Sequence, residues 1–268
     1  MSAGRAGPAD LWGDRPLPAR GETQRLQVGP LTLWLRGAGD EIWITFVRSI
    51  GARPFVAETP PDEAVWSRWA LPGGAGHLHV APAFPERPLV VKSEHPFTLM
   101  RRASVRIYGR VPVWVRVEMV TDPDGKRALL TEIPTVALSE TWWGDFRDGE
   151  LAYWLVATGR RELTPDLFED HTVLSTVQLD NVSEDDLQVE KLSLRVEHLS
   201  IFEKDGWLWA EEVRVEYLGE DEGTEIHMDD LPPREAAGAR EISPARHRSR
   251  SLRARTFARL KALSGWGD

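Results

Sequence analysis

The chain of 268 residues contains no cysteine. This absence excludes disulfide bonds, thiolate metal sites and cysteine nucleophiles, and it is compatible with a reducing cytoplasm. No run approaches the roughly 18 apolar residues of a membrane span. The N-terminal residues 1–20 lack the apolar core of a secretory signal. We therefore expect a cytoplasmic protein without a transmembrane segment.

Catalytic and cofactor-binding motifs are also missing. The sequence has no Gly-rich phosphate loop, no Gly-x-Ser-x-Gly elbow and no EF-hand loop. Its 7 histidines are scattered, and only His77 and His79 share a strand face at a spacing that metal sites use. No carboxylate follows them before Glu86, so we interpret both as ordinary strand residues. The sequence predicts no cofactor, no metal site and no catalytic residue.

One acidic cluster flanks two neighbouring tryptophans. It consists of Glu140, Asp145, Asp148 and Glu150 around Trp142 and Trp143. A glycosidase needs two carboxylates across a sugar. The Gly and Asp residues of this segment are equally typical of a solvated hairpin loop. A glycoside hydrolase is therefore the third functional hypothesis, behind two without catalysis.

Short stretches that alternate between apolar and polar residues dominate the chain. Residues 31–36 and 41–48 flank a Gly-containing loop and predict a hairpin in which Trp34 lies opposite Trp43. Residues 105–119 continue the alternation almost unbroken. Pro112 has no backbone N–H to donate to a neighbouring strand, which predicts an edge strand or a bulge.

Further strands are expected in the second half of the chain. Apolar runs cover 129–138 and 151–157, and residues 176–186 indicate a strand that leads into a polar turn. A turn at 203–206 predicts another hairpin. The spacing in 189–199 fits a helix or a strand, and we assign a strand with a bulge near Glu197.

One short helix is expected before residue 70. Thr59 is a suitable cap, Pro60 suits the first helical position, and Val65, Trp66 and Trp69 would form the buried stripe.

These patterns predict an all-β protein, an antiparallel β-sandwich formed as one large domain or two packed domains, with one short helix and a flexible basic C-terminal tail. The expected divisions are a disordered segment 1–21, a first sandwich region 22–128, a second sandwich region 129–230, and a linker and basic tail 231–268 with a candidate helix at 252–263. Deletion after Leu231 is expected to leave the fold intact.

Three stretches in this order resemble a prokaryotic family known as domain of unknown function 432. They are residues 105–116, residues 130–145 with 149–154, and residues 192–200 with 209–215. The resemblance covers roughly residues 22–230. It implies no activity and assigns no functional residue.

The charge is distributed unevenly along the chain. Residues 242–267 contain seven basic residues and no acidic one: Arg246, Arg248, Arg250, Arg253, Arg255, Arg259 and Lys261. Without this stretch and the terminal Asp268, the net charge of −9 becomes −15 for residues 1–241. The asymmetry favours an anionic partner for the tail, such as an anionic membrane surface or a protein. Nucleic acid is the least expected partner.

The chain contains 12 tryptophans, which is several times common usage. Core filling accounts for Trp66, Trp69, Trp207 and Trp209. A candidate surface for a partner or ligand consists of Trp34, Trp43, Trp114, Trp142 and Trp143. Trp34, Trp43 and Trp114 lie opposite the aliphatic face of their strands, so either a second layer or a partner must cover them. The leading hypothesis is a non-enzymatic intracellular accessory or protein-interaction module. The alternative is a β-sandwich that binds a carbohydrate or small ligand through exposed tryptophans.

Overall fold

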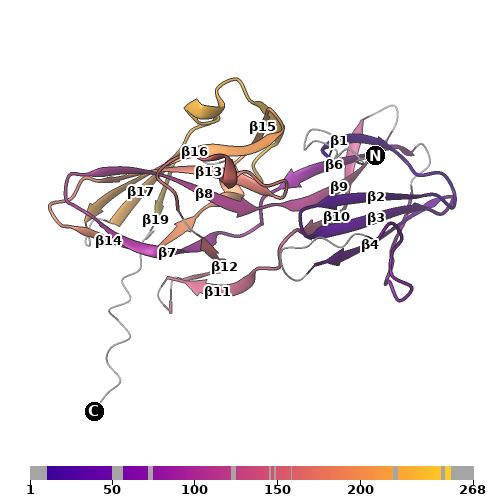
Figure 1. Ribbon diagram of the computed structural model, residues 1–268, viewed down its shortest axis with the longest axis horizontal. Helices are drawn as coiled ribbons and strands as arrows, with labels where there is room; N and C mark the ends of the chain where they lie inside the picture. The colour runs from indigo at the N-terminus through magenta and orange to yellow at the C-terminus, as the bar shows by residue number, and fades with distance from the viewer. Residues whose placement is uncertain are drawn as a thin grey trace, which may run out of the picture.

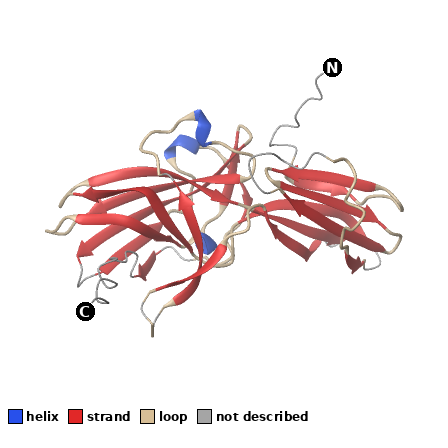
Figure 2. Cartoon of the chain, turned by 60° about the horizontal axis from the view of Figure 1, so that its bottom comes forward, coloured by secondary structure: helices blue, strands red, loops and turns tan. Residues whose placement is uncertain are grey.

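The computed structural model describes residues 11–49, 57–71, 75–121, 125–144, 146–147, 149–157, 159–219, 223–248 and 251–254. The described residues form strands, loops and short 3-10 turns without an α-helix. The strands make four sheets, which form the two lobes visible in Figure 1 and, from a second direction, in Figure 2. The expected all-β class is confirmed. No helix of the described residues is long and apolar enough to cross a membrane.

The first sandwich, on the right in Figure 1, contains two four-stranded sheets. The β3 sheet consists of β2 (Thr23–Val28), β3 (Leu31–Gly37), β4 (Glu41–Arg48) and β5 (Ser67–Ala70). The β6 sheet consists of β1 (Gly13–Pro16), β6 (Ala75–Ala83), β9 (Trp114–Thr121) and β10 (Lys126–Pro134). All neighbouring strands of both sheets are antiparallel.

The second sandwich, on the left in Figure 1, is larger. The β7 sheet has the order β11 (Ser139–Trp143), β12 (Glu150–Ala157), β7 (Leu89–Leu99), β14 (Leu187–Leu194). The β16 sheet has the order β18 (Arg240–Ser243), β15 (Ile201–Lys204), β16 (Trp207–Gly219), β13 (Thr172–Asn181), β8 (Ser104–Pro112), and β17 (Gly223–Met228) joins β16 to β19 (Ser251–Ala254).

Both sheets of the second sandwich are mixed, which corrects the expectation of purely antiparallel pairing. β12 runs parallel to β7, and β13 runs parallel to β16. Parallel neighbours need a long crossover connection. These connections contain strands rather than a helix. The connection from β7 to β12 contains β8 to β11, and the connection from β13 to β16 contains β14 and β15.

The chain crosses between the sandwiches three times: at residues 84–88, at Val113 and at residues 135–138. Pro112 ends β8 in the second sandwich, and β9 begins in the first sandwich two residues later. The proline therefore marks a change of sheet within residues 105–119. The sequence-based division between residues 128 and 129 does not follow this topology, because it falls inside β10.

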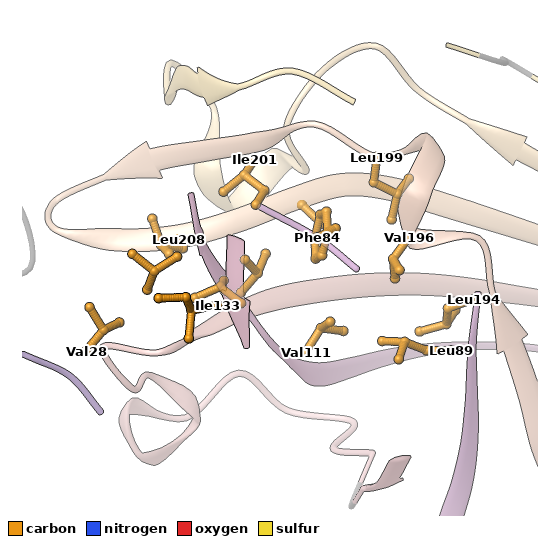
Figure 3. Packing of buried hydrophobic residues seen from close by; sticks show 14 of the residues in the cluster. Val28, Phe84, Leu89, Val111, Ile133, Leu194, Val196, Leu199, Ile201 and Leu208 are labelled. Carbon is orange, nitrogen blue, oxygen red and sulfur yellow. The ribbon is translucent and has the colours of Figure 1, made fainter. Parts of the chain in front are cut away.

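One hydrophobic cluster runs through both sandwiches and their junction. Figure 3 shows part of it, with Val28 and Ile133 from the first sandwich and Leu208 from the second. Phe84 lies in the same cluster, on the first crossing between the sandwiches. The two lobes thus share a continuous apolar interior and are not two independent cores joined by a linker.

The β3–β4 hairpin is present, but its register differs from the expected one. Arg36 pairs with Trp43, and Trp34 lies opposite Thr45. The shift is two residues, which is one full period of side-chain alternation, so each side chain keeps its expected face.

The expected helix before residue 70 is absent, and that prediction is wrong. Residues 57–66 form an irregular second layer on the face of the β3 sheet that carries Trp34. β5 follows this segment. The Trp34 indole donates to the Glu58 carbonyl at 3.0 Å, and the Thr45 hydroxyl donates to the Val65 carbonyl at 2.8 Å. In the expected helix the Val65 carbonyl would instead accept from the backbone N–H of Trp69. Val65 is exposed rather than buried.

Both terminal regions contribute to the fold, contrary to expectation. β1 pairs with β6, so residues 11–21 are not a disordered segment. β18 pairs with β15, and residues 231–248 are therefore not a linker. The expected helix at 252–263 is contradicted at its start, where β19 pairs with β17. Its remainder from residue 255 lies outside the described residues.

The ambiguous segment near residue 190 is a strand, as predicted. Its register shift lies between Val189 and Lys191. The bulge expected near Glu197 is instead a 3-10 turn at Val196–His198. The predicted turn at 203–206 connects β15 and β16, with Asp205 and Gly206 at positive φ.

Candidate interaction site at the junction of the two sandwiches

The β11–β12 hairpin lies at the lower edge of the molecule in Figure 1, near the junction of the lobes. Its register places Trp142 opposite Leu151 and Glu140 opposite Tyr153. Because strand side chains alternate, these four residues share one face of the hairpin.

This face carries exposed apolar side chains. Trp142 is 52% exposed and Leu151 is 48% exposed. Phe146, in the connecting loop, is 96% exposed. Such neighbouring exposed apolar groups are typical of a binding surface rather than of solvent-facing sheet.

Tyr153 extends this surface toward the first sandwich. Its ring contacts Trp114 of β9 edge-on, with 5.9 Å between ring centroids. Its hydroxyl donates to Glu86 Oε1 at 2.9 Å. Burial, followed by the nearby Glu86 carboxylate, raises the pKa of Tyr153 to about 12. The phenol therefore stays neutral and keeps its donor. We call Trp114, Tyr153, Leu151 and Trp142 the junction strip.

Charged residues border the junction strip. Arg87 Nη1 donates to Glu140 Oε1 at 2.6 Å, and the same guanidinium lies 5.7 Å from the centroid of the Tyr153 ring. Its Nε is 3.6 Å from Glu86. The segment between β6 and β7 thus supplies a polar border of alternating charge.

The opposite face of the hairpin is packed differently. Trp143 is 7% exposed and lies in a small cluster with Val90 and Ala152. Glu150 accepts a hydrogen bond from Arg195 Nη1 at 2.7 Å. Trp143 is therefore an interior residue of this layer, unlike its neighbour Trp142.

The carboxylates considered for sugar hydrolysis do not converge. Glu140 pairs with Arg87 on one face of the hairpin, and Glu150 pairs with Arg195 on the other. Asp145 and Asp148 lie outside the described residues. Glycoside hydrolysis requires two carboxyl groups that flank one glycosidic bond. Glu140 and Glu150 lie on opposite faces of the hairpin and do not meet this requirement.

The other two predicted tryptophans lie on the first sandwich. Trp34 is fully buried under residues 57–66. Trp43 is partly exposed and stacks against Arg68, whose guanidinium carbon is 4.2 Å from the ring centroid. Its indole donates to Glu41 at 2.6 Å. Of the five predicted tryptophans, Trp114 and Trp142 share the junction strip.

The basic C-terminal residues also separate into different roles. Arg246 is held at the junction by Glu132 and by the Phe84 carbonyl. Arg248 is exposed, 3.9 Å from Glu241. Arg250, Arg255, Arg259 and Lys261 lie outside the described residues, and of Arg253 only the backbone is described. Arg246 is therefore part of the fold rather than of an anion-binding tail.

The sequence did not reveal Tyr153, Glu86 and Arg87 as members of this site. Arg87 meets Glu140 from 53 positions away, and Tyr153 meets Glu86 from 67 positions away. The one local signal is the Glu-Arg pair at the exit of an apolar strand, which is common in surface turns.

The site can be compared with known proteins. A family model described as "Protein of unknown function (DUF432)" matches residues 11–261. The chain belongs to the DUF432 family. The match includes β1 and β18, so it extends beyond the range 22–230 that the sequence resemblance suggested. Curated proteins and solved structures gave no match.

Proposed function

We propose that this DUF432 protein is a non-enzymatic interaction module that binds a protein partner through the junction strip. One observation carries the proposal: Trp142 and Leu151 lie side by side on a hairpin face, each about half exposed, at 52% and 48%. Their aromatic and aliphatic surface continues into Tyr153 and Trp114.

The composition of the surface supports a protein partner. Protein interfaces are enriched in Trp, Tyr and Arg, with an apolar centre and a polar border. The junction strip supplies the centre, and Glu86, Arg87 and Glu140 supply the border. The matching partner surface presents apolar side chains surrounded by hydrogen-bonding groups. The cytoplasmic location and an anionic partner for the tail stay predictions from the sequence.

A pair of matched variants tests the proposal. Trp142→Ser combined with Leu151→Ser removes the exposed apolar centre, whereas Phe46→Ser removes a 42% exposed side chain from the first sandwich. Proteins crosslinked to the wild-type chain in its native cytosol are identified and purified, and their affinity for each variant is measured by calorimetry. We expect the double variant to bind at least roughly 30-fold more weakly, as for loss of a hot spot of about 2 kcal/mol. Phe46→Ser should bind like the wild type.

Two results would contradict the proposal. Equal affinity of the wild type and the double variant would place the interface elsewhere. A glycan that binds the wild type and not the double variant, with no protein partner, would support the carbohydrate-binding alternative.

A further inference from the structure

His77 and His79 lie on the solvent-facing side of the β6 sheet. They alternate along β6 with Leu78 and Val80, which are 0% and 1% exposed in the core of the first sandwich. Because strand side chains alternate between faces, both imidazoles project from the opposite side. This surface is separate from the junction strip.

β1 adds a carboxylate to these two imidazoles. The register places Asp14 directly opposite His79. Asp14 Oδ1 is 2.6 Å from His79 Nδ1 and 3.5 Å from His77 Nε2. One carboxylate oxygen thus meets two imidazoles that lie more than 60 residues later in the chain, His79 being 65 positions away.

We propose that Asp14, His77 and His79 form a binding site for a divalent transition-metal ion such as Zn²⁺. Imidazole nitrogens and carboxylate oxygens are its common protein ligands, and two imidazoles with one carboxylate favour Zn²⁺, Fe²⁺, Co²⁺ or Ni²⁺ over Mg²⁺ or Ca²⁺. Three protein ligands leave at least one coordination position for water or a small molecule.

Each imidazole lies within 3.5 Å of the same Asp14 oxygen, which is near the spacing of ligands around one ion. Ligand atoms bonded to a tetrahedral Zn²⁺ at about 2.0–2.1 Å lie about 3.3 Å apart. The separation of 3.5 Å between Asp14 and His77 is close to this value, and the 2.6 Å contact of Asp14 with His79 opens when the ion replaces the shared proton. The two imidazoles must also rotate toward each other about the carboxylate. The His77 side chain is 32% exposed and has room to rotate.

The charge state of the group also suits a cation. An aspartate carboxylate supplies a negative charge, and one oxygen of Asp14 is directed at both imidazoles. On the other side of His79, Glu118 of β9 lies opposite it and is 3.5 Å from Arg127. Glu118 is therefore engaged by a cation already and is not included among the ligands.

A second cluster provides an internal comparison. Glu216, Glu225 and His227 bring one ligand atom each within 4.8 Å of one another. They offer a single imidazole, and Arg253 of β19 lies opposite Glu225 in the strand register. His227→Ala therefore serves as the matched control for His77→Ala.

The experiment uses the untagged full-length chain after dialysis against a chelator. Zn²⁺ binding is measured by calorimetry, and Co²⁺ binding by its visible absorption. We expect one saturable site in the wild type, with affinity reduced by more than roughly tenfold in His77→Ala, His79→Ala and Asp14→Asn. His227→Ala should bind as the wild type does.

The variants also separate metal binding from folding. His79→Ala removes, and Asp14→Asn weakens, the side-chain hydrogen bond between β1 and β6, so circular dichroism in chelator checks the fold of both variants. His77→Ala removes only the longer 3.5 Å contact and keeps the test valid if the others unfold. The absence of saturable binding, unchanged affinity in His77→Ala, or loss of binding in His227→Ala would each overturn the proposal.

Discussion

Arg246 and Glu132 form an ion pair across the junction of the two sandwiches. Arg246 Nη2 donates to Glu132 Oε2 at 2.6 Å, although the residues are 114 positions apart. The same guanidinium donates to the Phe84 carbonyl at 2.8 and 2.9 Å. The other oxygen of Glu132 accepts from Arg116 Nε at 2.6 Å. The segment after β18 is thereby attached to the first sandwich.

Arg246→Ala is expected to destabilise the protein by about 2–3 kcal/mol, because it removes the donor to one oxygen of a largely buried carboxylate and both donors to the Phe84 carbonyl, while Arg116 still binds the other Glu132 oxygen. The side chains of Arg246 and Glu132 are 18% and 11% exposed. Urea unfolding measures the change. Arg248→Ala is the control, because its side chain is 75% exposed and should change stability by less than about 0.5 kcal/mol. Equal effects of the two variants would show that Arg246 contributes no more than a surface charge.

Trp34→Ala should cost about 3–5 kcal/mol of folding free energy, since the side chain is completely buried beneath residues 57–66. The loss includes the hydrogen bond from its indole to Glu58. Chemical denaturation of this variant is compared with that of Phe46→Ala, which removes a 42% exposed ring from the neighbouring strand. A Trp34 variant as stable as Phe46→Ala would mean that the second layer does not cover this face.

Truncation after Leu231 is expected to lower the melting temperature strongly, contrary to the sequence-based expectation. It removes β18, which pairs with β15, and the Arg246 contacts with Glu132 and Phe84. Truncation after Ala254 keeps every described contact and serves as the comparison. Thermal unfolding of both forms measures the difference. If the shorter form melts like the longer one, these contacts do not stabilise the fold.

Glu197→Gln should stabilise the protein at alkaline pH. Glu197 is 5% exposed, and burial raises its pKa above the usual value of 4.5. Its Oε2 has no hydrogen-bond partner among the described residues. The group's contribution to stability is fully present below pH 4.5 and decreases as the pH rises through the folded-state pKa, because the ionised form is penalised by burial.

Urea midpoints of the wild type and Glu197→Gln at several pH values test this sign. The variant should have a higher urea midpoint than the wild type at about pH 8, and the difference between the two midpoints should become smaller toward about pH 4. A variant that is less stable at about pH 8 would instead show that the folded protein stabilises the Glu197 carboxylate through Arg195, 3.6 Å away.

Local features of the sequence predicted the strands and turns well. The hairpin turn at 203–206 depends on Asp205 and Gly206, which adopt the positive φ that such residues tolerate. Alternation also predicted that either a second layer or a partner covers Trp34, and residues 57–66 are that layer. Pro112 signalled an interruption of its strand, but the change of sheet depends on partners that alternation does not specify.

Contacts between distant segments could not be predicted in this way. Asp14 meets His79, and Arg246 meets Glu132, only after strands from opposite ends of the chain have paired. Trp114 and Trp142 look equivalent in the sequence to Trp34 and Trp143, yet the first two lie on the junction strip and the others are buried. The difference arises from which layer covers each strand face, and that is a property of the tertiary arrangement.

The three crossings of the chain have a consequence for synthesis of the protein. In the β6 sheet, β6 pairs with β9, and β9 pairs with β10. Both β9 and β10 are synthesised only after β7 and β8. β7 and β8 in turn pair with β12, β13 and β14. As a nascent chain leaves the ribosome, the first sandwich is therefore completed while two strands of the second are still unpaired. Those two strands expose ladder groups until β14 has emerged, 60 residues after the end of β10. This interval is when the chain is most open to association with other chains or to binding by a chaperone.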